Sequence, residues 1–116
     1  MRGRYFEVTV NGAWRERKYN DYKTAADGSL YLIIDVTAKC IDTESRVFSE
    51  GSAFTTYKGK ELEYDKAEHH SQKIGALNPL IKETGKVIYL VPEELTGPYC
   101  WVPGREADLR FALGNF

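Results

Sequence analysis

Strict alternation of side chains between Leu30 and Cys40 constrains the fold of this chain more than any other feature. Small or apolar residues take every second position, as Leu30, Leu32, Ile34, Val36, Ala38 and Cys40. Successive side chains of a β-strand point to opposite faces, so this period of two predicts a long strand with one face in a core. A helix would need apolar positions three or four residues apart. We therefore expect a central β-strand here.

The same period of two recurs along the chain, and we find no segment with the period of an amphipathic helix. Further strands are expected within residues 6–10, 47–57, 62–64, 85–91, 99–102 and 109–113. The Lys58-Gly59-Lys60 turn predicts a hairpin, whereas Asn11-Gly12 is expected to end the first strand and open a long loop. About seven or eight short strands without crossover helices predict one all-β domain, residues 1–116, built as an antiparallel sandwich or barrel.

Charge and composition argue against two functional classes. The formal net charge is −1, which does not give the excess of Lys and Arg that a broad grip on nucleic acid needs. No stretch approaches the roughly 20 apolar residues of a membrane-spanning helix. The start, Met1-Arg2-Gly3-Arg4, has no apolar run behind it and is not a signal peptide. Either the protein is intracellular, or an export segment has been removed from its start.

A basic and aromatic segment is the first candidate for a ligand or partner surface. Its members are Trp14, Arg15, Arg17, Tyr19 and Tyr22, with Lys18 and Lys23 between them. Aromatic rings among basic side chains can stack on bases or sugars, and Arg can lie over a ring. The alternative is that these side chains pack a long loop against one end of the sandwich.

A second candidate is a surface metal site at Glu68, His69 and His70, preceded by Glu61, Glu63 and Asp65. Imidazole and carboxylate groups are ligands for Zn²⁺ or Ca²⁺. However, Glu61, Glu63 and Asp65 alternate as the solvent side of a half-buried hairpin would. Adjacent histidines on an extended chain also point in opposite directions, so a solvated face is the simpler interpretation.

The two cysteines, Cys40 and Cys100, could form a disulfide between the sheets. Alternatively, Cys40 packs as a small apolar residue on the core face of the central strand. No residue pair or glycine-rich loop has the context of a nucleophile, an acid–base pair or a phosphate site, so we expect no enzyme and no cofactor.

Three segments, in order, resemble the motifs of one known family. Residues 31–39 resemble its long strand with aliphatic-Asp-Val-Thr, and residues 54–64 resemble its hairpin with a Gly-Lys turn and a Tyr. Leu77-Asn78-Pro79, followed by residues 85–92, resembles its Leu-Asn-Pro, Gly, strand, Val-Pro signature. The family consists of bacterial envelope and lipoprotein domains of unknown function and is named for a telomeric-repeat-binding factor. The likeness covers roughly residues 5–113.

This resemblance implies an immunoglobulin-like antiparallel β-sandwich with no catalytic residues, no agreed ligand and no nucleic-acid partner. It also implies a lipid anchor outside the sequence in hand. The chain departs from the family at Cys40, where Asn is usual, and at Leu80, where Gly usually follows Asn-Pro.

The function expected from the sequence is that of a non-catalytic module of the bacterial cell envelope, acting through protein–protein or surface contacts. A homodimer formed through exposed sheet edges fits this expectation. Two alternatives stay open: a domain that binds a small ligand, glycan or metal, and an intracellular or phage-encoded accessory protein of the inhibitor type.

Overall fold

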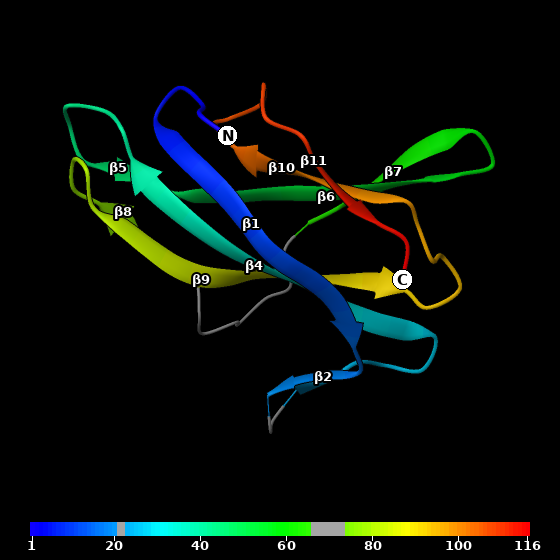
Figure 1. Cartoon of the computed structure of the whole chain (residues 1–116). Coiled ribbons are helices and arrows are strands. Elements are labelled where there is room, and N and C mark those ends of the chain that lie inside the picture. The colour runs from blue at the N-terminus through cyan, green and yellow to red at the C-terminus, as the bar shows by residue number, and fades with distance from the viewer. Residues whose placement is uncertain (21–22, 66–73) are drawn as a thin grey trace.

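Two antiparallel sheets form the body of the chain in the computed structural model, which describes residues 1–20, 23–65 and 74–116, and side chains for 1–18, 24–65 and 74–116 (Figure 1). The first sheet has the order β1-β4-β9 and the second β11-β10-β6-β7. Their bounds are β1 Phe6–Glu16, β4 Ser29–Cys40, β9 Lys82–Pro92, β11 Phe111–Gly114, β10 Tyr99–Gly104, β6 Ser49–Tyr57 and β7 Lys60–Tyr64. Two short ribbons flank them, β2 Lys18–Asn20 with β3 Lys23–Thr24, and β5 Arg46–Val47 with β8 Ala76–Leu77. No described residue lies in a helix.

The strand order is that of an immunoglobulin-like sandwich. Of the strands in the two main sheets, the first, second and fifth along the chain share one sheet, and the third, fourth, sixth and seventh share the other. In immunoglobulin terms these are sheets ABE and GFCC′, because the fourth strand has joined the sheet of the third. The predicted fold class is confirmed.

The central strand predicted from alternation is β4, and it pairs with β1 on one side and β9 on the other. Leu32, Ile34, Val36, Ala38 and Cys40 are fully buried, as predicted. The inner faces of both sheets complete this core with Phe6, Val8, Phe48, Val87, Tyr89, Val91, Tyr99, Trp101 and Phe111.

The outer face of the first sheet is apolar at one end, which alternation alone did not predict. Tyr31 and Ile33 of β4 are 9% and 3% exposed, although they point away from the main core. They form a second cluster with Ile88 of β9 and Ala25, and Trp14 packs against it. The residues after β3 therefore cover part of this face.

The first strand does not end at Asn11-Gly12, contrary to the expectation from the sequence. The register of β1 against β4 shifts between Val10 and Gly12, and the strand then continues to Glu16. Such a shift is a β-bulge, in which one extra residue is accommodated without ending the pairing. The Asn11 side-chain amide donates to Thr37 Oγ1 at 2.9 Å and to Asp35 Oδ1 at 3.3 Å, which holds the bulge against β4.

One buried carbonyl joins the two sheets. The Trp101 indole N–H on β10 donates to the Glu50 carbonyl oxygen on β6 at 2.8 Å and to the Tyr89 hydroxyl on β9 at 2.9 Å. The Tyr89 hydroxyl donates to the same carbonyl at 2.8 Å. Burial raises the pKa of Tyr89, so the hydroxyl keeps its proton and its role as a donor.

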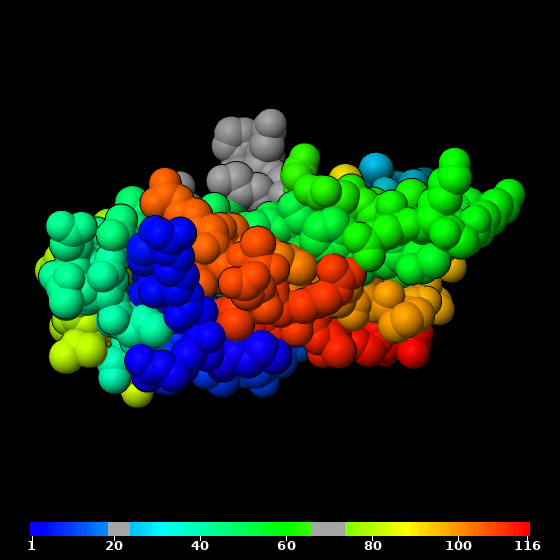
Figure 2. Space-filling model, turned by 90° about the horizontal axis from the view of Figure 1, so that it is seen from above, coloured from blue at the N-terminus to red at the C-terminus, as the bar shows by residue number. Residues whose placement is uncertain are grey.

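A buried carboxylate anchors the start of β1. Glu106, 2% exposed, accepts hydrogen bonds from the backbone N–H groups of Arg4, Tyr5 and Phe6, the last two at 2.5 and 3.0 Å. A Cβ at Gly3 would lie 1.9 Å from the Glu106 carboxylate, so a larger residue there would displace this carboxylate from its hydrogen bonds. Figure 2 shows the N-terminal segment lying against the segment that follows β10.

Gly51 and Gly59 provide a matched test of close packing between β6 and β10. Both have positive φ, +71° and +78°, but a Cβ at Gly51 would meet the Val102 carbonyl at 1.9 Å, whereas nothing lies within 4 Å of one at Gly59. We expect Gly59→Ala to cost about 1 kcal/mol of unfolding free energy, from backbone strain alone. Gly51→Ala should cost about 2 kcal/mol more, because β6 and β10 must also separate. Urea denaturation of both variants checks this, and equal losses would contradict the packing argument.

Candidate functional site

Trp14, the aromatic residue at the start of the predicted ligand surface, packs against the fold. It lies opposite Ile33 in the pairing of β1 with β4 and is only partly exposed. Its ring packs against the cluster of Ala25, Tyr31, Ile33 and Ile88. Trp14 therefore packs against the sandwich, as in the alternative to a ligand surface.

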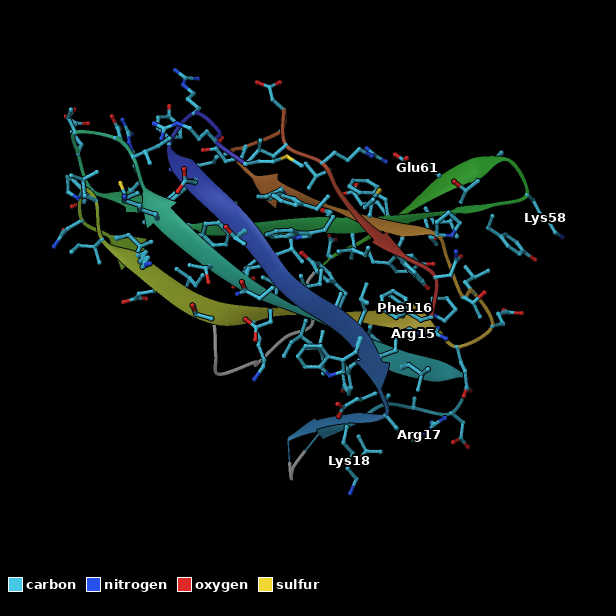
Figure 3. All side chains as sticks on the ribbon, viewed as in Figure 1. Arg15, Arg17, Lys18, Lys58, Glu61 and Phe116 are labelled. Atoms are coloured by element: carbon cyan, nitrogen blue, oxygen red, sulfur yellow. The ribbon has the colours of Figure 1, made fainter. Side chains whose placement is uncertain are left out.

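Arg15 is occupied by the loop that joins β9 to β10 (Figure 3). Its Nη1 atom donates to the backbone carbonyls of Pro92, Glu93 and Leu95, at 3.3, 3.3 and 3.1 Å. The Leu95 carbonyl also accepts the Tyr99 hydroxyl at 2.7 Å. A guanidinium presents several donors in a fixed plane, which suits it to hold a turn of carbonyl groups. Arg15 thus fixes a loop across the end of the sandwich.

Of the other predicted members of that surface, Arg17 contacts the same loop through Glu93, and the rest lie outside the description. Arg17 is exposed, and its guanidinium lies 3.5 Å from Glu93 Oε2 and 3.9 Å from Asp27 Oδ1. The Tyr19 side chain and Tyr22 lie outside the described residues. Among the described side chains, Arg15 and Arg17 therefore both contact Glu93, while Trp14 packs on the second apolar cluster.

The predicted metal ligands Glu68, His69 and His70 also lie outside the described residues. Within the described part of the chain, no group of three His, Cys, Asp or Glu side chains could hold a metal ion. Glu61 and Glu63, which precede the segment, have other partners: Glu61 pairs with Arg110 at 2.7 Å, and Glu63 accepts the Ser52 hydroxyl at 2.9 Å.

The two cysteines are free thiols that lie on different faces, so the proposed disulfide is not formed in this structure. Cys40 is fully buried in the core, and its thiol donates to the Glu44 carbonyl at 3.4 Å. Cys100 lies between Tyr99 and Trp101, both of which face the core, so alternation turns its side chain to the outer face of β10. There it neighbours Arg110, whose pKa is raised first by Glu61 and then by Cys100.

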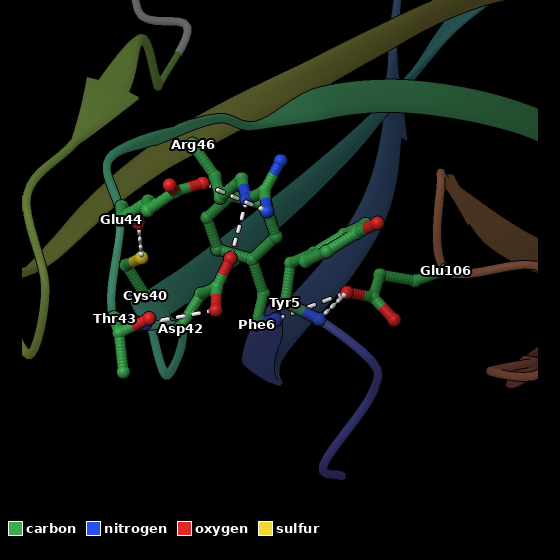
Figure 4. A network of polar contacts seen from close by, with 8 residues as sticks. All are labelled: Tyr5, Phe6, Cys40, Asp42, Thr43, Glu44, Arg46 and Glu106. Carbon is green, nitrogen blue, oxygen red and sulfur yellow. Dashed lines mark hydrogen bonds and ion pairs between the residues drawn. The ribbon is translucent and has the colours of Figure 1, made fainter.

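Two cations lie over the Tyr5 ring just before β1, and Figure 4 shows one of them, Arg46. The Arg46 guanidinium is 4.3 Å from the Tyr5 ring centroid, and that of Arg4 is 5.0 Å away. Arg46 Nε also donates to Asp42 Oδ2 at 2.5 Å, and Arg46 Nη2 lies 3.4 Å from Glu44 Oε2. The cluster ties the β4–β5 loop to β1 through charge-assisted hydrogen bonds and cation–π contacts.

The turn between β8 and β9 presents two adjacent aliphatic side chains to solvent, of which the sequence singled out only Leu80, as a departure from the resembled family. Leu80 is 68% exposed and Ile81 51%. The backbone of this turn is held on the end of β4: Leu80 N–H donates to the Cys40 carbonyl at 2.8 Å, and Cys40 N–H donates to the Ile81 carbonyl at 3.1 Å. The turn is therefore a fixed projection of the sandwich end (Figure 1).

Beside this turn is a shallow hollow of about 250 Å³ on the outer face of the first sheet. It is lined by Glu7, Thr9, Thr37, Lys39, Leu80 and Lys82. Lys39 and Lys82 lie directly opposite each other on β4 and β9. Within the described residues, neither lysine has an acidic side chain within ion-pair distance, whereas Glu7 lies 3.6 Å from Arg2. The exposed apolar pair and the hollow form one surface, which we call the turn surface.

The Arg15 contacts predict a structural role that is separable from that of Arg17. We expect Arg15→Ala to lower the free energy of unfolding by about 2 kcal/mol, because three carbonyl groups lose a charged donor. Arg17→Ala should change it by less than about 0.5 kcal/mol, since its ion pairs are exposed. Thermal and urea unfolding of the two variants measure the difference, and an Arg15 variant as stable as wild type would contradict this role.

The Arg46 bridge predicts a shift in the titration of Asp42. The hydrogen bond from Arg46, followed by that from the Thr43 N–H, lowers the pKa of Asp42 below its usual 3.8. A lowered folded-state pKa means that the bridge stabilises above that usual value and is lost as the pH falls through the folded-state pKa. NMR titration of the Asp42 carboxyl group should show the shift. Arg46→Gln should return the pKa toward 3.8, and Arg4→Gln should change it less.

A midpoint for Asp42 that is the same in wild type and in the Arg46 variant would contradict this assignment. The Arg4 variant serves as the control, because it removes the same charge from the same ring while leaving the hydrogen bond in place.

Comparison with solved structures finds one similar fold. The chain aligns with the "Crystal structure of a putative lipoprotein (ycdA) from Bacillus subtilis subsp. subtilis str. 168", with a TM-score of 0.63 and 13% sequence identity. The match covers 96% of this chain and 37% of that protein, so the chain spans little more than a third of its neighbour's length. At this identity the likeness shows the fold alone.

Sequence comparison identifies the family. No curated protein matches the chain. None of the described residues forms a helix with the length and hydropathy needed to span a bilayer. Residues 2–99 match a family described as a domain of unknown function, DUF4352. The match covers most of the chain, so the protein belongs to the DUF4352 family.

Proposed function

We propose that this chain is a non-catalytic β-sandwich module of the bacterial cell envelope, which acts through contacts of its surface with a partner. The observation that carries the proposal is the turn surface: two large aliphatic side chains, Leu80 and Ile81, are held in solvent by a rigid turn. Single exposed apolar residues are common on protein surfaces, but an adjacent pair on a fixed projection is a feature of contact sites.

The use of polar groups elsewhere in the molecule supports a role without chemistry. Arg15 holds backbone carbonyls, Glu106 holds backbone N–H groups, and the Tyr89 hydroxyl and the Trp101 indole share one carbonyl. Each of these groups has a structural partner. A catalytic acid, base or nucleophile needs a side chain that faces a substrate.

Two observations favour the envelope over the cytoplasm for this domain. The family that its motifs resemble consists of bacterial envelope domains, and its fold neighbour is described as a putative lipoprotein. A lipid anchor or further domain outside this sequence would place the sandwich at a membrane. The proposal therefore includes an extracytoplasmic location.

Two residues of the predicted ligand surface are already engaged within the fold, which weakens the alternative of a ligand-binding domain. Trp14 packs in the second apolar cluster and Arg15 binds backbone carbonyls, so neither is free to hold a ligand. The alternative of an intracellular accessory protein makes the opposite prediction about location, and fractionation of cells separates the two.

Site-specific photo-crosslinking in cells tests the proposal. The full-length gene product, with a photo-reactive amino acid in place of Ile81, should form adducts and should be accessible to protease added to spheroplasts. The same amino acid at Lys60, on the hairpin at the far end of the sandwich, is the matched control and should form few adducts (Figure 1). A protease-protected protein, or adducts of equal yield at both positions, would overturn the proposal.

A further inference from the structure

We propose that the turn surface docks on an anionic lipid bilayer: Leu80 and Ile81 enter the interfacial apolar region, and Lys39 and Lys82 contact lipid phosphates. This inference rests on the proposed function and names the partner of the same surface.

The apolar half of the surface is already in its binding conformation. The backbone hydrogen bonds between the turn and Cys40 fix its position on β4, and Ile81 N–H donates to the Asn78 carbonyl at 3.1 Å. Ser45 and Asn78 join the β4–β5 loop to the turn through a side-chain hydrogen bond of 2.6 Å. Little ordering would therefore accompany insertion of the two aliphatic side chains.

Leu80 adopts a backbone conformation that favours glycine. Its φ is +65°, in the left-handed region where a Cβ is unfavourable and glycine is preferred. A leucine at this place is strained and also exposes an aliphatic side chain to water. Strained residues persist where they serve a function. Entry of the side chain into an apolar phase would remove the second of these costs.

The charged half of the surface is complementary to lipid phosphates. Lys39 and Lys82 face each other across β4 and β9, and like charges in directly opposed positions repel. An anionic group in the hollow between them would relieve that repulsion. The hollow also presents the hydroxyl group of Thr9 as a hydrogen-bond donor, whereas the hydroxyl of Thr37 is engaged by Asn11 and Thr84.

The acidic side chains near this end do not cancel the two lysines. Glu7 faces Lys39 directly across β1 and β4 and also lies 3.6 Å from Arg2, so this one carboxylate is shared among Arg2, Lys39 and the nearby Lys82. Asp42 and Glu44 are both engaged by Arg46. Glu83 lies one residue from Lys82 on β9, so alternation turns it to the other face of the strand.

A bilayer fits the surface better than a folded protein does. Two aliphatic side chains and a shallow hollow fall far short of the roughly 1,000 Å² that a specific protein interface buries. The same elements suit weak membrane contact, at or below the affinity of a single acyl chain, about 10⁴ M⁻¹. Such contact would orient a sandwich that a separate lipid anchor or domain holds near the membrane.

Vesicle co-sedimentation at millimolar lipid tests the inference. Wild-type protein should pellet with vesicles of equal parts phosphatidylglycerol and phosphatidylcholine but not with pure phosphatidylcholine vesicles. Raising the ionic strength from about 0.1 to 1 M should release it, because the Debye length falls from about 10 to 3 Å.

Two double variants remove the two halves of the surface. Leu80→Gly with Ile81→Ser should weaken binding at least tenfold, and its fold should persist because glycine suits the backbone at position 80. Lys39→Gln with Lys82→Gln should also weaken binding at least tenfold. The matched controls are Leu90→Ser, an exposed aliphatic on β9, and Lys58→Gln with Lys60→Gln; both should stay within about twofold of wild type.

Three results would overturn the inference: no binding to anionic vesicles, equal binding to neutral ones, or equal losses in the control variants. Binding that inorganic phosphate abolishes at constant ionic strength would also overturn it, because the lysines would then recognise a free anion. If residue 81 crosslinks to a protein in cells while the vesicles fail to bind, this inference falls and the proposed function stands.

Discussion

The relative position of the two sheets depends on the hydrogen bonds that meet at the Glu50 carbonyl. Hydrophobic contact between the inner faces is strong but has no direction, so it would allow the sheets to slide or rotate. Trp101 and Tyr89 come from opposite sheets, are fully buried, and both donate to that carbonyl. An unpaired donor in the core costs about 1–3 kcal/mol, so any slip that breaks the group is opposed.

This constraint extends outward along β9. With Tyr89 fixed toward the core, alternation sends Ile88 to the outer face, where it completes the second apolar cluster. Trp14 packs on that cluster and Arg15, its neighbour on β1, reaches the loop after β9. Trp14 and Arg15, two members of the predicted ligand surface, thus take part in the packing of the sandwich.

The fold could be predicted from the sequence because its signals are local. Alternation through β4 and the Lys58-Gly59 turn depend on neighbouring residues, and both features are present. The features that were missed depend on contacts distant in sequence. Asn11 forms a bulge because Thr37 and Asp35 accept its amide protons, and Glu106 is buried because backbone N–H groups about 100 residues away need an acceptor. No local pattern encodes such partners.

The candidate surfaces were harder to predict for the same reason. Residue type suggested that Arg15 was available for a ligand, but its acceptors lie 77 to 80 residues away on another loop. Leu80 stood out in the sequence only as a departure from the usual Gly of the resembled family. Its exposure and its positive φ are visible only in the structure. The separation of Cys40 and Cys100 follows from which face of each strand they occupy.

The groups that stabilise this molecule and the surface proposed for contact therefore lie in different parts of it. The inner faces and the buried polar groups hold the sandwich, so the turns at its ends can carry residues that do not help it fold. Leu80 and the opposed pair Lys39 and Lys82 are such residues, and all three line one hollow. Independent unfavourable features would be expected to scatter over the surface. Their concentration at one end is the basis of the contact proposed there, and the rest of the fold supplies the rigidity that such a contact would require.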